Sequence, residues 1–294
     1  MSRATLTFAA PIDFPASFAI FRRSGDDLLD RWDGATLMRT ARINGKSLAY
    51  AARVTGSPDR PALLIEAEDD AMSEAVVAAV ADSFAPLRDE FVSLRETDTV
   101  VGRLARLHAG FRPVLHPDLF LALVRCISAQ QVNLRWAATV RRRLAERFGD
   151  RHTVGALEVY SLNAERIAAA DISEIRELQF TTRKAEYIIN VAQAIISGTL
   201  DLEVLRAMSD EDVIGRITAV RGLGVWSAEW ILARTLGRAR VSAFDLGVRK
   251  AVGKAYLGGR MPSPDEVRAA TAHWRGGANY AQELLLHAQH QKTL

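Results

Sequence analysis

The stretch Val-Arg-Gly-Leu-Gly-Val-Trp-Ser-Ala (residues 220–228) places two glycines between two segments with helical patterning. Upstream, Ser209 is a favourable N-cap, and the three acidic residues that follow it favour the start of a helix. Gly222 and Gly224 therefore predict a tight helical hairpin within residues 209–236. Its backbone amides, together with the N-terminus of the second helix, can bind a phosphate. A turn between two packed helices explains the same pattern without any ligand.

Charge is uneven along the chain, although the net charge of the 294 residues is only +3. Residues 1–100 carry 11 basic and 16 acidic side chains, whereas residues 101–294 carry 27 and 19. The contents of 49% apolar and 25% charged residues are those of a folded globular protein, and the length suits about two domains. The basic part can attract a polyanion such as nucleic acid, although excess arginine is also common on solvated surfaces. We expect the acidic part to face away from that polyanion.

Composition excludes several classes of protein. No window approaches the roughly 18 consecutive apolar residues of a membrane span. Residues 1–15 lack the basic region and apolar run of a secretory signal, so we expect a cytoplasmic protein without a membrane segment. The chain has one cysteine, Cys126, which excludes an internal disulfide, a thiolate zinc site and a four-cysteine iron–sulfur cluster.

The first ninety residues predict an α+β domain. Asn44-Gly45 tolerates the positive φ angles of a tight type I′ turn, and strand-like segments flank it, so a β-hairpin is expected at 36–54. Two further strands and one helix are expected at 6–9, 61–68 and 72–84. We therefore place an α+β accessory domain, an antiparallel sheet with helices, at residues 1–90.

After about residue 90 the apolar residues follow helical spacing. We expect residues 91–294 to form an all-α region that contains the helical hairpin. Its predicted helices are at 117–127, 133–148, 163–170, 183–197, 202–206, 209–219, 226–236, 245–257, 264–274 and 278–290.

Residues 220–228 resemble the hairpin of the helix-hairpin-helix DNA glycosylases, and residues 243–251 resemble the segment that carries their catalytic aspartate. The resemblance extends to 127–132 and 180–192, and so covers about 115–257. The subgroup that the chain most resembles is the bacterial 3-methyladenine DNA glycosylase II, which also has an N-terminal α+β domain. The resemblance implies a monofunctional DNA glycosylase of base excision repair. Such an enzyme flips bases of the 3-methyladenine and 7-methylguanine type out of double-stranded DNA and excises them hydrolytically, leaving an abasic site.

Asp245 is the catalytic residue that the resemblance implies, and it also begins a predicted helix, which an aspartate caps well. Cleavage of an N-glycosidic bond develops positive charge on the sugar, so a fixed carboxylate stabilises the transition state and can orient the attacking water. Arg249 follows one helical turn later, where it can pair with Asp245 and lower its pKa, or contact a DNA phosphate. An ordinary surface ion pair is an equal alternative.

Trp226 and Trp230 lie one helical turn apart and so share one face of the second hairpin helix. In the resembled subgroup these positions line the base pocket, where an aromatic face attracts a cationic alkylated base. A stripe of core side chains explains the same spacing. Relatives that also cleave the DNA backbone have a lysine at the position of Trp226, which forms a Schiff base. Tryptophan at that position predicts a glycosylase without lyase activity.

Gln130 and Gln131 interrupt an apolar segment. By resemblance, Gln130 lines the site and Gln131 fills the space that the flipped base leaves, whereas a solvated helix end is the alternative. Arg221 stands where the family hairpin usually has proline, and it adds a phosphate contact. The expected DNA-binding residues are Gln131, Arg221, Gly222, Gly224 and Arg249. Residues 284–286 are leucines and supply no aromatic pocket wall, which predicts a more open pocket and a broader range of bases.

The predicted chemistry requires no cofactor, and no metal site is predicted. The resemblance leaves open a structural monovalent cation at the hairpin. His287 and His290 have a spacing that can ligate a metal, but no third ligand accompanies them, so we interpret them as solvated residues. We expect a monomer that binds double-stranded DNA with alkylated bases. Two other functions stay open: a non-enzymatic helix-hairpin-helix DNA-binding protein, and a bifunctional glycosylase/lyase for oxidised bases.

Overall fold

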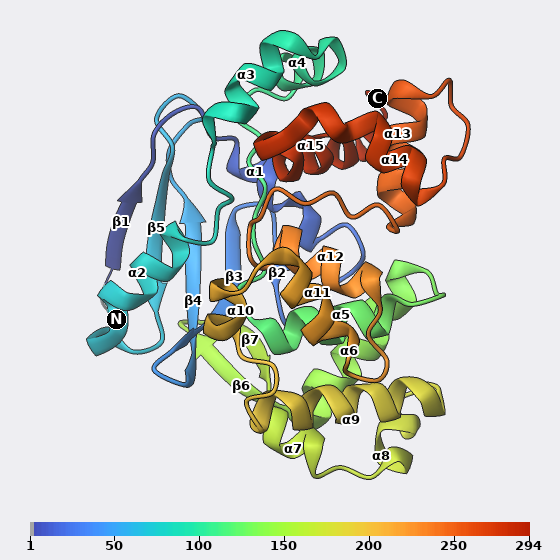
Figure 1. Ribbon diagram of the computed structural model, residues 1–294. Helices are drawn as coiled ribbons and strands as arrows, with labels where there is room; N and C mark the ends of the chain where they lie inside the picture. Colours follow the sequence, from blue (N-terminus) through green and yellow to red (C-terminus); the bar gives the residue numbers. More distant parts are fainter. Residues whose placement is uncertain (1–2) are drawn as a thin grey trace.

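The computed structural model describes residues 3–294, and its first part is built on a five-stranded antiparallel sheet (Figure 1). The strand order is β1-β5-β4-β3-β2. The strands are β1 (Arg3–Thr7), β2 (Arg31–Trp32), β3 (Thr36–Ile43), β4 (Lys46–Val54) and β5 (Ala62–Ala67). The predicted hairpin is confirmed, because β3 and β4 pair across Asn44 (φ 49°) and Gly45 (φ 77°). The first strand begins earlier than predicted, since its pairing with β5 extends back to Arg3.

One face of this sheet is covered by short helices and an aromatic core. The helices are α1 (Phe14–Phe18), η1 (Ala19–Phe21), η2 (Asp70–Met72) and α2 (Ser73–Ala81). Phe14, Phe18 and Phe84 contact one another there, with ring centroids 5.5 to 5.8 Å apart. Burial of these rings stabilises the domain, and α2 confirms the helix predicted in this part of the chain.

Helices make up most of the remaining chain, and they pack around two cores. Around the first core lie α5 (Leu119–Ala129), α6 (Leu134–Phe148), α7 (Ala164–Ala168), α8 (Ile172–Glu177), α9 (Thr182–Ile196), α10 (Leu202–Ala207), α11 (Asp210–Thr218) and α12 (Val225–Arg234). Around the second lie α3 (Asp89–Thr97), α4 (Thr99–Leu107), α13 (Leu246–Tyr256), α14 (Pro264–Thr271), η3 (Ala272–Gly277) and α15 (Ala278–His290). Thus α3 and α4 pack against the far end of the chain (Figure 1).

The predicted fold class is confirmed, with one addition in the helical region. Strands β6 (Gly149–Val154) and β7 (Leu157–Leu162) form a second hairpin. Val154 and Val159 of this hairpin pack against Met38 and Ala51 on the other face of the first sheet. The hairpin therefore joins the two parts of the protein, and its strands were missed because only this packing gives their apolar side a partner. No helix among residues 3–294 is long and apolar enough to span a bilayer.

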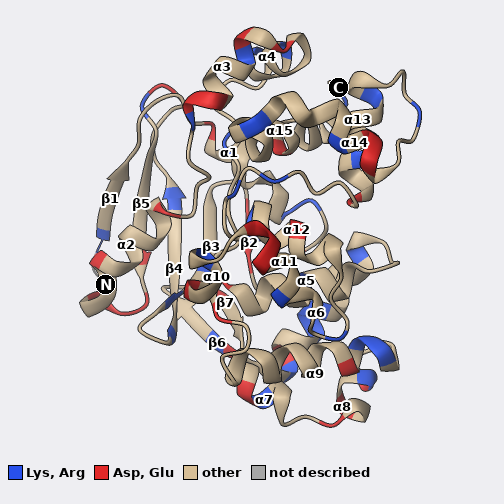
Figure 2. Ribbon diagram, viewed as in Figure 1, with Lys and Arg blue, Asp and Glu red and all other residues tan. Residues whose placement is uncertain are grey.

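The predicted start of the first hairpin helix is confirmed by its cap, whereas the second hairpin helix ends at Arg234, two residues earlier than predicted. Ser209 caps α11 by accepting a hydrogen bond from the Asp212 amide at 3.1 Å. Acidic residues mark the start of this helix in Figure 2, whereas basic residues mark α6. The N-terminus of a helix carries a partial positive charge, so the acidic residues in the first turn of α11 stabilise that helix.

Buried ion pairs connect the first domain to α5 and α6. Asp27 accepts from Arg125 at 2.8 Å and from Arg141 at 2.9 Å, and Asp30 accepts from Arg39 at 2.6 Å and from Arg125 at 2.7 Å. Burial alone would raise the pKa of Asp27, but the two arginines outweigh it and hold that pKa below its usual value. The network fixes the loop before β2 against the helical region.

Candidate active site

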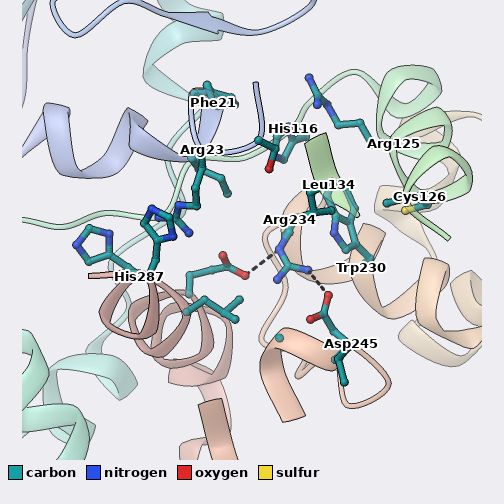
Figure 3. Close-up of a pocket in the computed structure, with 18 of the residues that line it drawn as sticks. Phe21, Arg23, His116, Arg125, Cys126, Leu134, Trp230, Arg234, Asp245 and His287 are labelled. Carbon is teal, nitrogen blue, oxygen red and sulfur yellow. Dashed lines mark ion pairs between the residues drawn. The ribbon is translucent and has the colours of Figure 1, made fainter. Parts of the chain in front are cut away.

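A cleft of about 1370 Å³ opens between the first domain and the helices (Figure 3). Phe21 and Arg23 of the first domain line it, so part of this domain faces the site, contrary to the expectation from its acidic charge. The other walls come from the α5–α6 connection, α12, the start of α13 and α15. Their lining residues include Gln130, Gln131, Trp226, Trp230, Arg234, Asp245, Glu283 and Leu286.

Asp245 is held in this cleft by three neighbours. It caps α13, because Oδ1 accepts a hydrogen bond from the Val248 amide at 3.1 Å. Oδ2 accepts one from Trp226 Nε1 at 3.3 Å, and Arg234 Nη1 lies 3.9 Å from the same oxygen. The side chain is 19% exposed, so it retains access to the cleft while its position is fixed. The structure therefore brings Asp245 and Trp226 together in one cleft.

Arg249 does not pair with Asp245 in the structure. Its Nε donates to the carbonyl of Pro262 at 2.8 Å instead. The cation nearest to the Asp245 carboxylate in the described ion pairs is Arg234, from the preceding helix. The interpretation of residues 245 and 249 as an ion pair is wrong, because spacing along one helix allows a contact but tertiary packing decides it.

Sequence reasoning missed Arg234 and Glu283. Arg234 is buried, and its Nε lies 2.9 Å from Glu283 Oε1 while its Nη1 faces Asp245 (Figure 3). Burial raises the pKa of Glu283, which attraction to Arg234 opposes. Arg234 follows Trp230 by one helical turn, so the spacing that selected the tryptophans could also have found it. Helical spacing could not have identified Glu283, since this residue lies on α15 and not on α12.

Trp226 and Trp230 both line the cleft and are partly exposed, so a fully buried core stripe does not describe them. The guanidinium carbon of Arg234 lies 5.4 Å from the centre of the Trp230 ring. The ring of His116 lies 5.3 Å from the Trp230 ring, centroid to centroid, at an interplanar angle of 36°. Trp230 therefore already holds a cation against its ring, whereas Trp226 is oriented by its hydrogen bond to Asp245.

The helical hairpin joins α11 to α12 as predicted. Gly222 has φ +104°, and a Cβ atom there would lie 2.2 Å from Cγ of Tyr187, so only glycine fits. Gly224 is the N-cap of α12 and supplies no side-chain cap, which leaves the first amides of the helix open. Gln130 Nε2 donates to the Gly222 carbonyl at 3.0 Å and so ties the hairpin to the end of α5.

The two remaining predicted DNA-binding residues are exposed. Gln131 has φ +54°, an uncommon conformation for a residue other than glycine, and lies at the cleft. Arg221 has a 71% exposed side chain, paired with Glu186 at 3.1 Å. A phosphate contact from Arg221 would compete with that surface pair, which is weak.

Among residues 3–294, no cluster of histidine, cysteine and acidic side chains could hold a metal ion. His287 is buried against Phe111 with ring centroids 4.4 Å apart, so its interpretation as a solvated residue is wrong. Burial lowers the pKa of His287 to about 4.

At the hairpin, the carbonyl of Val220 accepts a hydrogen bond from the Leu223 amide at 3.1 Å. This carbonyl oxygen has a second lone pair that could still bind a cation, so the monovalent cation at the hairpin stays a prediction.

Comparisons of sequence and of structure with known proteins agree on one family. Residues 124–275, about half of the chain, match the family described as HhH-GPD superfamily base excision DNA repair protein. YfjP of Bacillus subtilis is 33% identical over 175 residues, which are 59% of this chain and 60% of that protein, less than two thirds of its length. DNA-3-methyladenine glycosylase 2 of Escherichia coli is 26% identical over 240 residues, 81% of this chain and 80% of that protein. The solved structure of 3-methyladenine DNA glycosylase from Archaeoglobus fulgidus matches the fold with a TM-score of 0.81 at 22% identity, over 98% of this chain and 96% of that one.

Proposed function

The chain belongs to the HhH-GPD superfamily of base excision DNA repair proteins, and from this premise we propose that it is a DNA glycosylase for alkylated bases. It flips bases of the 3-methyladenine and 7-methylguanine type out of double-stranded DNA and hydrolyses the N-glycosidic bond, leaving an abasic site. The name of the Escherichia coli relative supports this substrate class. The observation that carries the proposal is Asp245, fixed at the wall of a cleft that two tryptophans line.

Asp245 supplies the charge that the reaction needs. As the bond to the base breaks, the sugar becomes positively charged, and a preorganised carboxylate beside it lowers the free energy of the transition state. The hydrogen bonds from Val248 and Trp226 hold the carboxylate without covering it. An alkylated purine already carries positive charge and leaves without a proton, so one carboxylate suffices for this substrate class.

The hairpin and the α5–α6 connection hold the DNA. The open amides that follow Gly224 suit a phosphate, and the N-terminus of α12 adds favourable partial charge. Gln131, an exposed residue that lines the cleft, fills the gap left by the flipped base and offers hydrogen bonds to the orphaned partner base. Trp226 and Leu286 then line the space that the base enters.

The enzyme is monofunctional, because Trp226 cannot form a Schiff base. The lysine nearest to Asp245 in sequence, Lys250, is an exposed residue of α13 that lines the cleft, so the proposal needs a direct test for covalent chemistry. Borohydride treatment during turnover on damaged DNA is expected to trap no covalent adduct. A trapped adduct would establish the bifunctional glycosylase/lyase instead.

The decisive experiment substitutes Asp245→Asn and measures single-turnover release of 7-methylguanine from a duplex with one such base. We expect a loss of about 10²- to 10³-fold, typical for removal of one preorganised electrostatic group, with DNA binding retained. Asp201→Asn is the matched control, because Asp201 caps α10 by accepting from the Val204 amide at 2.9 Å, and it does not line the cleft. Full activity in Asp245→Asn would refute the mechanism. Absence of base release by the wild type would favour the non-enzymatic DNA-binding protein.

A further inference from the structure

A buried carboxylate on α12 holds an arginine of α14 beside the segment that leads to Asp245. The side chain of Glu229 has no exposed surface, and its Oε1 accepts a hydrogen bond from Arg268 Nη2 at 2.9 Å. Arg240 Nη2 lies 3.6 Å from the same oxygen. A buried charge that loses its partner is strongly destabilising, so Glu229 favours the arrangement in which Arg268 stays in place. None of these three residues lines the cleft, so none contacts a base that enters it.

The guanidinium of Arg268 has little freedom to move, because two of its nitrogens are bonded. Nη2 donates to Glu229, and Nη1 donates to Asp265 Oδ1 at 3.0 Å. A guanidinium is planar and rigid, so two bonded nitrogens restrict its orientation. Its central carbon lies over the ring of Phe244, 5.3 Å from the ring centre. Cation–π attraction at this distance holds the ring beside α14.

Helix α14 is a rigid support for this contact. Ser263 and Glu266 form a reciprocal capping box, in which each side chain accepts a hydrogen bond from the backbone amide of the other, at 3.2 and 2.8 Å. Val267, the residue before Arg268, is fully buried in the core that also contains Val248 of α13. The helix that carries Arg268 and the helix that Asp245 caps therefore share one core.

Phe244 is an exposed apolar residue directly before Asp245. It is 44% exposed and lines the cleft, so hydrophobic burial does little to hold its ring. Further back in the connection from α12 to α13, the Ser242 amide donates to Gln282 Oε1 on α15 at 2.8 Å. Arg268 therefore supplies the side-chain contact that holds the last residue before Asp245.

We propose that Arg268, oriented by Glu229, is a positioning residue that sets the direction in which Asp245 enters the cleft. The inference rests on the proposed glycosylase function and adds to it two residues that lie outside the cleft. A carboxylate stabilises positive charge on the sugar only from the correct position, and a misplacement of about 1 Å can lower a rate by about 10²-fold.

This role differs from that of the groups that bond to the carboxylate itself. The hydrogen bonds from Val248 and Trp226 orient the Asp245 carboxylate relative to α13 and α12. The contact between Arg268 and Phe244 instead orients the backbone that carries Asp245. Loss of this contact should therefore slow the chemical step without weakening the binding of DNA.

The test removes each side of the contact separately and then both sides together. Arg268→Gln, Phe244→Leu and the double variant are compared with wild type for single-turnover release of 7-methylguanine. We expect release at saturating enzyme to be about 10- to 100-fold slower in each single variant, with the half-saturating enzyme concentration unchanged. Because both substitutions break one contact, the double variant should be no slower than the slower single variant. Independent effects on folding would instead multiply.

Two matched variants separate positioning from loss of charge or of bulk. Arg260→Gln removes an arginine that pairs with Glu266 of the same helix at 2.7 Å, and it should release the base at the wild-type rate. Phe244→Tyr retains the ring and should also keep the wild-type rate, whereas Phe244→Leu retains an apolar side chain without a ring. Urea unfolding of each variant measures its stability in parallel.

The outcomes distinguish this inference from the proposed function. Multiplied losses in the double variant, or the wild-type rate at saturating enzyme in either single variant, would overturn the role of Arg268. Equal losses in Arg260→Gln and Arg268→Gln would overturn it too, because charge alone would then explain the effect. The glycosylase function itself fails only if the wild type releases no base or Asp245→Asn keeps full activity. If Arg268→Gln does not fold, equal rates for Phe244→Leu and Phe244→Tyr would still refute the inference.

Discussion

Gly222→Ala should destabilise the protein through the hairpin backbone. At φ +104° an alanine is strained, and its Cβ would lie 2.2 Å from Cγ and 2.5 Å from Cβ of Tyr187, so the ring must move. A left-handed backbone costs an alanine about 1–2 kcal/mol and overpacking about 1–3 kcal/mol, so we expect the free energy of unfolding to fall by about 2–5 kcal/mol. Tyr187 also packs beside Arg221, with 6.0 Å between the ring centre and the guanidinium carbon, so DNA binding should weaken too.

Gly224→Ala is the matched control for this substitution. Gly224 has φ −123°, and a Cβ there would meet no atom within 4 Å, so the free energy of unfolding should change by less than about 1 kcal/mol. The added methyl group nevertheless projects at the start of α12, where we propose that a DNA phosphate approaches, and we expect about tenfold weaker binding to duplex DNA, equivalent to about one lost hydrogen bond.

The assays are urea unfolding followed by circular dichroism, and fluorescence anisotropy with a labelled duplex at fixed salt. An equal loss of stability in both variants, or a stable Gly222→Ala, would refute the steric reasoning. Unchanged DNA affinity in Gly224→Ala would refute the assignment of the hairpin as a phosphate site.

Two further substitutions test the site and its support. Trp226→Phe keeps an aromatic ring but removes the hydrogen bond to Asp245, and since such a bond to a charged group contributes about 1.5–3 kcal/mol, single-turnover excision should slow by about 10- to 100-fold. Trp136→Phe, on the exposed side of α6, is the control, and equal rates for the two variants would contradict the role of this bond. Asp27→Asn leaves Arg125 and Arg141 without their buried partner and should lower the free energy of unfolding at neutral pH by about 3–5 kcal/mol. Because the pKa of Asp27 is lowered in the fold, its stabilisation is present above pH of about 4 and is lost as pH falls further, so urea unfolding should show the two proteins converging in acid.

Some parts of the fold and the site could be predicted from the sequence because they depend only on neighbouring residues. A helix N-cap depends on residues within one turn, and Ser209 and Asp245 both cap the helices that their sequence context predicts. The same holds for the turn at Asn44-Gly45, where two neighbouring residues determine the backbone conformation. Trp226 and Trp230 share a face because the helix repeat places them there.

Other parts depend on contacts between distant segments. Spacing allowed Arg249 to reach Asp245, yet Arg249 donates to Pro262 because the chain after α13 folds back beside it. Arg234 faces Asp245 instead, and Glu283 completes this group from a helix 49 positions further along the chain. No periodicity in one segment encodes which side chain of another segment will fill the space beside it.

The sequence by itself determined the α+β and helical organisation, the glycine hairpin, the capping aspartate and the family they resemble, because backbone conformation and capping are set by neighbouring residues. Only the tertiary structure decided that the first domain lines the cleft, that Arg234 is the cation beside Asp245 and that a second carboxyl group, Glu283, lies behind it. These features depend on burial, which brings charges from separate elements together and makes their pairing and their pKa values properties of the whole fold.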